Sequence, residues 1–132
     1  MLEEGDKLNF DAGSAKPIYI QIAEWMEDEI LQGHFQVDGK VHSQYKLADM
    51  YNINPATAAK GLTKLAEEGV LYDRRGLGKF VAEEANAIIK EKRRNKTMKR
   101  LVDDLVKEAG KLEMTEEEVI TLIKETWGGA KE

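Results

Sequence analysis

Three short segments of the chain carry polar and basic side chains that are suited to binding nucleic acid. Hydroxyl, amide and ammonium groups hydrogen-bond to base edges, and cations pair with phosphate. Glycines between such groups let the backbone approach a groove closely. The candidate DNA-binding residues in the three segments are Ser43, Gln44, Tyr45 and Lys46; Asn54, Thr57, Lys60 and Lys64; and Arg75, Gly76, Gly78 and Lys79.

The second segment begins a predicted helix over residues 54–68. Thr57, Lys60 and Lys64 are spaced at i, i+3 and i+7, so they share one side of that helix, away from its apolar side. A helix that enters the major groove presents its N-terminal residues to the bases. We therefore predict base contacts for Asn54, Thr57 and Lys60 and a phosphate contact for Lys64. In the alternative interpretation, Asn54 only caps the helix and the lysines lie on a solvated face.

The other two segments have the patterns of a helix start and of a β-hairpin. The free amides at a helix N-terminus attract anions, so residues 43–46 are predicted to contact phosphate. In the hairpin, Arg75 and Lys79 flank a glycine-containing turn that is small enough to approach a DNA groove. An ordinary hairpin turn explains the same two glycines equally well.

The order of the elements predicts a mainly α fold with a small β-hairpin wing. Apolar residues recur at helical spacing over residues 18–32, and residues 40–42 are compatible with a short strand. A helix over residues 44–51 precedes the helix at 54–68 by a helix-turn-helix spacing, and the hairpin at 70–81 follows. Residues up to Lys16 are polar and are expected to form an irregular arm. This order is that of a winged helix-turn-helix.

Two amphipathic helices are predicted after residue 84. The first is expected to run from Ala85 to Glu108 and stop at Gly110; the second begins at Thr115 and ends before Gly128. Their apolar side includes Met98, Leu101, Val102, Leu105, Val119, Ile123 and Trp127. One small helical hairpin cannot bury all of it, so we predict a homodimer in which a second copy covers it. The alternative is that these helices fold back on the first domain.

The composition argues against an enzyme. The 132 residues include no cysteine, and the two histidines, His34 and His42, stand in unrelated positions. Thiolate chemistry is therefore excluded, and no metal-ligand or nucleophile–base spacing is visible. We expect no cofactor, no metal, no membrane span and a cytosolic location. The net charge of −5 is unusual for a DNA-binding protein, although a local basic surface can exist on an acidic chain. The basic run at 90–100 either contacts flanking phosphate or links two modules as a solvated helix.

Several short motifs follow one another in residues 17–82. They are Pro17-Ile18-Tyr19, Leu47-Ala48, Leu65 with Glu68-Gly69, and the sequence RGLGKFV at 75–81. Together they resemble the DNA-binding domain of the GntR-type bacterial repressors, and the short two-helix tail is similar to the YtrA subfamily. The resemblance implies a winged helix-turn-helix DNA-binding domain in residues 1–82 and a helical dimerisation segment in residues 83–132. It also implies double-stranded DNA as partner, bound at an inverted repeat. An effector, if one binds, is not identified by the sequence.

The chain departs from the family pattern at two places. Where the family has Ser-x-Arg at the start of the second helix, the third position is Tyr45. Where the family has Ser-Arg-x-Thr-Val-Arg, residues 54–59 read Asn-Pro-Ala-Thr-Ala-Ala. The operator sequence is therefore not implied. The missing arginines and the acidic balance support a second hypothesis, a winged-helix protein-interaction module that has lost DNA binding.

Overall fold

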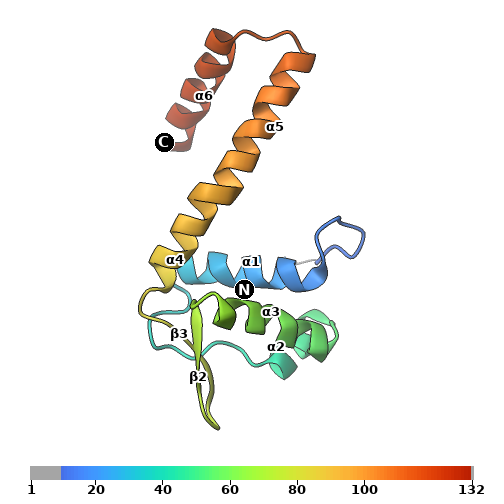
Figure 1. The fold of residues 1–132 in the computed structure, drawn as a ribbon, viewed down its shortest axis with the longest axis vertical. Coiled ribbons are helices and arrows are strands. Elements are labelled where there is room, and N and C mark those ends of the chain that lie inside the picture. Colours follow the sequence, from blue (N-terminus) through green and yellow to red (C-terminus); the bar gives the residue numbers. More distant parts are fainter. Residues whose placement is uncertain (1–9, 132) are drawn as a thin grey trace. The chain divides into compact units, whose positions relative to one another are not determined.

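The computed structural model describes residues 10–131, most of which are helical. Its elements are α1 (Ile18–Leu31), α2 (Gln44–Tyr51), α3 (Pro55–Glu67), β2 (Leu71–Arg74), β3 (Gly78–Val81), α4 (Ala85–Lys92), the π-helical stretch η1 (Arg93–Thr97), α5 (Met98–Lys111) and α6 (Glu116–Lys131) (Figure 1). They belong to two units, residues 1–91 and residues 92–132. The mainly α winged helix-turn-helix predicted from the sequence is confirmed.

Local capping bonds explain why α2 and α3 begin where the sequence predicts. Ser43 Oγ accepts a hydrogen bond from the Lys46 amide at 3.1 Å. Asn54 Oδ1 accepts one from the Ala56 amide at 2.7 Å. Asn52 ends α2 in the left-handed conformation, with a φ of 55°. Each of the two capping bonds satisfies an amide that has no partner within its helix. The left-handed Asn52 and the Asn54 cap together fix the turn between α2 and α3 locally.

The core of the N-terminal unit lies between α1, α2, α3 and the hairpin. Its fully buried side chains include Ile22, Met26, Ile30, Leu47, Leu65, Val70 and Val81. α1 and α3 approach closely at Gly61, where a Cβ would lie 2.9 Å from the carbonyl oxygen of Tyr19. Ala85 and Ile89 of α4 are also buried in this core. The unit therefore extends to residue 91, past the boundary expected at residue 82.

The hairpin pairs β2 with β3 in antiparallel register, with Leu71 opposite Val81 and Arg74 opposite Gly78. It extends beyond the helices of its unit (Figure 1). The short strand expected at residues 40–42 is reduced to one bridge, in which Lys40 lies opposite Phe80.

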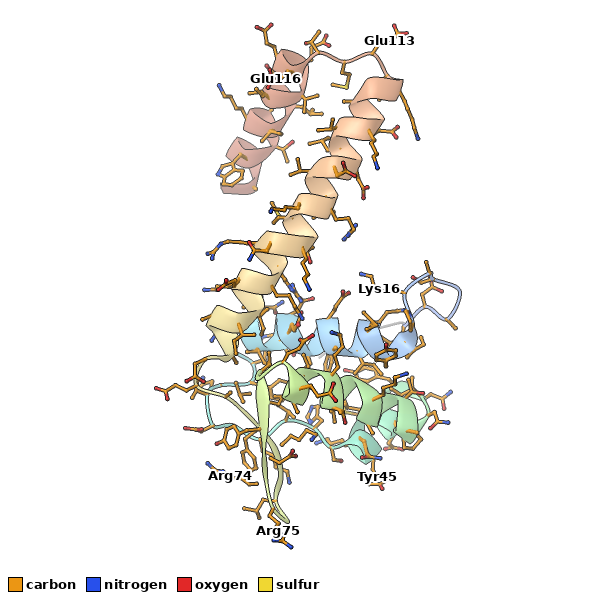
Figure 2. The ribbon with its side chains drawn as sticks, viewed as in Figure 1. Lys16, Tyr45, Arg74, Arg75, Glu113 and Glu116 are labelled. Atoms are coloured by element: carbon orange, nitrogen blue, oxygen red, sulfur yellow. The ribbon has the colours of Figure 1, made fainter. Side chains whose placement is uncertain are left out.

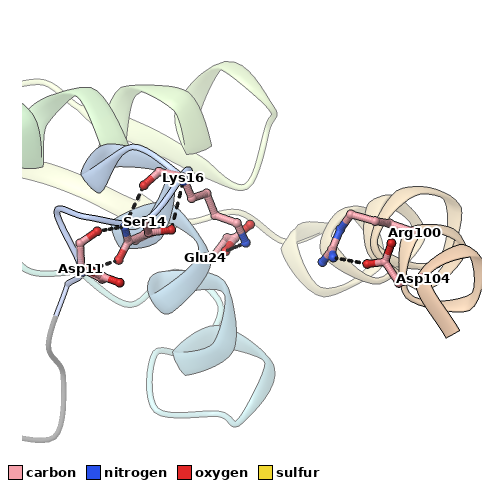
Figure 3. A network of polar contacts seen from close by, with 7 residues as sticks. Asp11, Ser14, Lys16, Glu24, Arg100 and Asp104 are labelled. Carbon is pink, nitrogen blue, oxygen red and sulfur yellow. Dashed lines mark hydrogen bonds and ion pairs between the residues drawn. The ribbon is translucent and has the colours of Figure 1, made fainter. Parts of the chain in front are cut away.

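Residues 10–16 form turns that are tied to α1. The Gln21 amide donates to the carbonyl oxygens of Asp11 and Lys16, both at 2.8 Å, and its oxygen accepts from the Asp11 amide. Lys16 Nζ pairs with Glu24 at 2.9 Å (Figure 3). The irregular arm is thus confirmed for these residues. The rest of the predicted arm, residues 1–9, lies outside the described residues.

In the C-terminal unit, both helices pass the glycines that were expected to end them. α5 continues through Gly110 to Lys111, and α6 continues through Gly128 and Gly129. A glycine costs a helix interior only about 1 kcal/mol, so it does not by itself end a helix. The chain instead turns after α5 at Glu113, whose φ is 59°. The expected ends at 108 and 127 were therefore wrong.

Two further features concern how these helices are wound and capped. Residues 93–97 form a π-helical stretch, which the sequence analysis did not predict. The capping box at the start of α6 is confirmed. The Thr115 amide donates to Glu118 Oε1 at 2.9 Å, and the Glu118 amide donates to Thr115 Oγ1 at 3.1 Å.

Candidate nucleic-acid interface

One groove of the N-terminal unit brings the start of α2 next to the hairpin. This wing-side groove has a volume of about 370 Å³ and runs between residues 40–45, Leu62 of α3 and residues 73–79. The predicted DNA-binding residues that line it are Ser43, Gln44, Tyr45, Gly78 and Lys79. In Figure 2, Tyr45 and the hairpin-tip residue Arg75 lie toward the same edge of the unit. Two of the three predicted segments therefore meet at one surface.

The start of α2 offers backbone amides and exposed side chains to this groove. Ser43 Oγ is occupied by the Lys46 amide, while the other first-turn amides have no partner within the helix. The Tyr45 side chain is 70% exposed, so its ring and hydroxyl are available to a ligand. Lys46 is exposed one residue further on.

The hairpin brings backbone and charge to the other side of the groove. Gly76 and Gly78 have φ values of 77° and 115°, which L side chains rarely adopt. Lys79 Nζ pairs with Asp73 at 2.8 Å, so part of its charge is neutralised within the hairpin. Arg75 is exposed at the tip. Its neighbour Arg74 is engaged in the fold, with its guanidinium carbon 4.4 Å from the Phe80 ring centroid.

Two residues of the groove were missed by the sequence analysis. The Lys40 side chain lies across Gly78, where a Cβ would be 3.0 Å from Lys40 Cε. His42 lies half-buried between Lys40 and α2, with its ring 5.2 Å from the Phe35 ring centroid. Burial, and secondarily the nearby Lys46 charge, lower the pKa of His42 below 6.5. The signal for both residues was the short strand at 40–42, because a strand that pairs with the wing must lie beside it.

Two of the predicted base-reading residues, Thr57 and Lys60, lie on the side of α3 that faces α1, not on the side next to the wing-side groove. Ala56, Thr57 and Lys60 line a second groove of about 700 Å³ with Pro17, Ile18 and Tyr19 at the start of α1 (the α1-side groove). Lys60 Nζ lies 4.2 Å from the centroid of the Tyr19 ring. The structure does not bring these residues together with the wing.

The remaining two polar residues predicted on α3 also have partners within the unit. Lys64 forms an ion pair with Glu68, one turn further along the helix. Asn54 caps α3 through its side-chain oxygen. The capping bond assumed in both interpretations of Asn54 is thus present.

The side of α3 next to the wing-side groove carries a row of small residues. Leu62 lines that groove, and successive residues of an α-helix are rotated by about 100°. Pro55, Ala59 and Thr63 are therefore spaced one turn apart beside Leu62, on the side away from Tyr19. Pro55 and Thr63 are exposed and Ala59 is half-buried.

The C-terminal unit exposes the apolar residues predicted to form a dimer interface. Leu105 and Val119 are partly buried, and the other large members of this C-terminal apolar face are at least two-fifths exposed. These are Met98, Leu101, Val102, Val106, Ile120, Leu122, Ile123 and Trp127. A groove of about 570 Å³ between α5 and α6 is lined by Leu105, Leu122, Ile123, Thr126, Trp127 and Ala130. Within residues 10–131, no helix has the length and apolar character needed to cross a membrane.

Two curated relatives match most of the chain. The HTH-type transcriptional regulator YhcF of Bacillus subtilis is 30% identical over 111 residues, which cover 84% of this chain and 90% of the relative. The HTH-type transcriptional repressor YtrA of the same organism is 28% identical over 127 residues, covering 94% and 98%. No family model matches the chain.

Solved structures give the same result for the fold. A GntR family transcriptional regulator from Listeria monocytogenes has a TM-score of 0.68 at 29% identity, covering 85% of this chain and 96% of that one. The DNA-binding domain of AraR, solved in complex with operator ORE1, has a TM-score of 0.51 at 30% identity, covering 57% and 94%.

Proposed function

Because the chain belongs to the GntR family of helix-turn-helix transcription regulators and is YtrA-like, we propose that it binds operator DNA as a homodimer and represses transcription. The observation that carries this proposal is the wing-side groove, where the start of α2 meets the hairpin. In helix-turn-helix proteins the second helix of the motif enters the major groove and the first crosses the backbone. α3 and α2 take these two roles.

The start of α2 and the groove cations contact phosphate. First-turn amides and the helix dipole attract an anion at residues 43–46. Lys40, Lys46 and Arg75 add positive charge around this point, and Gly76 lets the hairpin tip approach a groove. Lys60 was expected from the sequence to read bases. Its position over Tyr19 favours a backbone contact beside α1 instead.

A second copy of the chain covers the C-terminal apolar face. Exposed apolar patches of this kind mark interaction sites, and two-fold pairing is the commonest arrangement of soluble oligomers. A two-fold dimer presents two copies of α3 to successive major grooves about 34 Å apart, so the operator is an inverted repeat.

One observation favours a second candidate function, a winged-helix module that binds protein. Three predicted DNA-contacting lysines have partners within the unit: Lys60 lies over Tyr19, Lys64 pairs with Glu68, and Lys79 pairs with Asp73. Their contribution to attracting phosphate is smaller than for free lysines. The chain as a whole is also acidic.

Selection of bound sequences from randomised duplex DNA, repeated at several salt concentrations, separates the two functions. A regulator enriches a palindrome, and its affinity falls steeply as salt rises. Lys40→Ala makes the negative slope of log K against log salt shallower by about 1 per subunit, because each subunit then neutralises one phosphate fewer. The matched control is Lys124→Ala on α6, which leaves the slope unchanged. A folded protein that enriches no sequence and shows no salt-dependent binding supports the protein-interaction module instead.

A further inference from the structure

We propose that the N-terminal half of α3 recognises thymine methyl groups, so that thymines in the major groove define each operator half-site. This inference rests on the proposed function and names the class of base that the site reads. It follows from which side of α3 faces the wing-side groove and from the side chains found there.

The contacts of α3 fix its orientation within the unit. Gly61 packs against Tyr19, whereas Leu62, about 100° further around the helix, lines the wing-side groove. Pro55 and Ala59 lie three or more residues before Leu62, on the same flank as Leu62. This flank lies next to Tyr45 and the hairpin, the other parts of the proposed interface.

Only hydrocarbon side chains occur on this flank in the first turns of α3. Pro55 is exposed and Ala59 is half-buried, whereas Ala56 lines the α1-side groove with Thr57 and Lys60. Neither Pro55 nor Ala59 can donate or accept a side-chain hydrogen bond. Of the nearby polar candidates, Asn54 uses its side-chain oxygen to cap the helix, and the Lys60 ammonium lies over the Tyr19 ring.

The chemistry of the major groove gives such a surface one preferred partner. Bases present mainly hydrogen-bonding groups there, whereas thymine also presents its C5 methyl group. Alanine side chains make apolar contact with that methyl group, and their small size lets the helix backbone approach the base edges. The α3 surface therefore favours thymine by burying its methyl group and gains nothing comparable from guanine.

Replacing thymine with deoxyuridine tests this directly, because it removes only the methyl group and keeps base pairing. In the selected palindrome, each thymine is replaced in turn at both half-sites, and the dissociation constant is measured. Burying one methyl group is worth about a fourfold change in affinity, so at least one position weakens binding by about that factor per half-site. Equal affinity for thymine and deoxyuridine at every position overturns the inference and leaves the proposed function intact. Failure to select any sequence overturns both.

Ala59→Gly removes the protein's half of the contact. The ratio of deoxyuridine to thymine dissociation constants at the sensitive position falls toward one. Both dissociation constants are measured on the same variant, so any loss of helix stability affects them equally and cancels in their ratio. The matched control is Ala87→Gly, an exposed alanine of α4, which keeps the wild-type ratio. A second variant, Ala59→Arg, shifts the selected base from thymine toward guanine. An unchanged ratio in Ala59→Gly together with unchanged selection by Ala59→Arg contradicts the assignment of α3.

Discussion

The two units of the chain differ in how far they bury their large apolar side chains. Leu65 and Ile22 of the N-terminal unit are 0% and 1% exposed, whereas Leu122 and Trp127 of the C-terminal unit are 49% and 64% exposed. Among the described residues after 91, Ala109 alone is buried. Residues 10–91 therefore close their own hydrophobic core. The C-terminal helices instead carry an apolar face that only another surface can remove from water.

The largest difference between the units is expected for leucine truncation. Leu65→Ala removes a fully buried side chain and lowers the free energy of unfolding of the N-terminal unit by about 2–5 kcal/mol. Leu122→Ala, measured at a concentration where the chain is monomeric, changes the free energy of unfolding of the C-terminal unit by about 0.5 kcal/mol or less. Urea denaturation followed by circular dichroism measures both. A comparable loss in the two variants would show that the C-terminal helices bury their leucines within one chain.

The C-terminal apolar face is tested by truncating its largest side chain. Trp127→Ala weakens association of the proposed dimer by about 2 kcal/mol or more, because buried aromatic anchors dominate interface energies. Sedimentation velocity over a concentration series measures the dissociation constant. The matched control is Leu77→Ala, which removes an exposed apolar side chain from the hairpin. Tyr72→Ala is not suited, because the Tyr72 hydroxyl donates a hydrogen bond to Asp38. Unchanged association of Trp127→Ala places the dimer interface elsewhere.

Glycine-to-alanine changes are expected to have opposite signs in the two units. Gly61→Ala places a Cβ 2.9 Å from the Tyr19 carbonyl oxygen, and the resulting overpacking costs about 1–3 kcal/mol. Gly110→Ala adds a methyl group with no neighbour within 4 Å, and stabilises α5 by about 0.4–1 kcal/mol. Thermal unfolding distinguishes the two. Stabilisation by Gly61→Ala would contradict the close packing of α1 and α3.

The smallest effect concerns the pH dependence of the N-terminal unit. The lowered pKa of His42 means that the unfolded chain binds this proton more readily than the folded one. Wild-type stability therefore falls as the pH drops below 6.5, until the folded protein is protonated as well. His42→Gln removes this contribution, so stability declines less over the same interval. Urea denaturation at a series of pH values measures the difference, and His34→Gln is the matched control for loss of a histidine. Identical pH profiles of wild type and His42→Gln would exclude the effect.

Elements that depend on local bonds were predictable from the sequence. The starts of α2, α3 and α6 each follow from one side chain that accepts from an amide two or three residues later: Ser43, Asn54 and Thr115. Such bonds need no distant residue, so the residue types at these positions identify them.

Features that depend on tertiary contacts were not predictable in the same way. Gly61 has no side chain, so a helical projection assigns it to neither the apolar nor the polar side of α3. In the structure, Gly61 is where α3 approaches α1 closely. The sequence pattern predicts Lys60 to read bases, and it does not reveal that the Lys60 ammonium lies over the Tyr19 ring. The glycine inside the helix was the available signal, because a helix interior favours alanine unless something lies too close.

The exposed face of α5 and α6 has a consequence for dosage. When only paired chains occupy an operator, mass action makes the amount of active regulator depend on the square of the monomer concentration below the association midpoint. Doubling the supply of monomer then raises occupancy about fourfold, and dilution at cell division lowers it as steeply. The proposed dimer would thus respond more steeply than linearly to its own abundance.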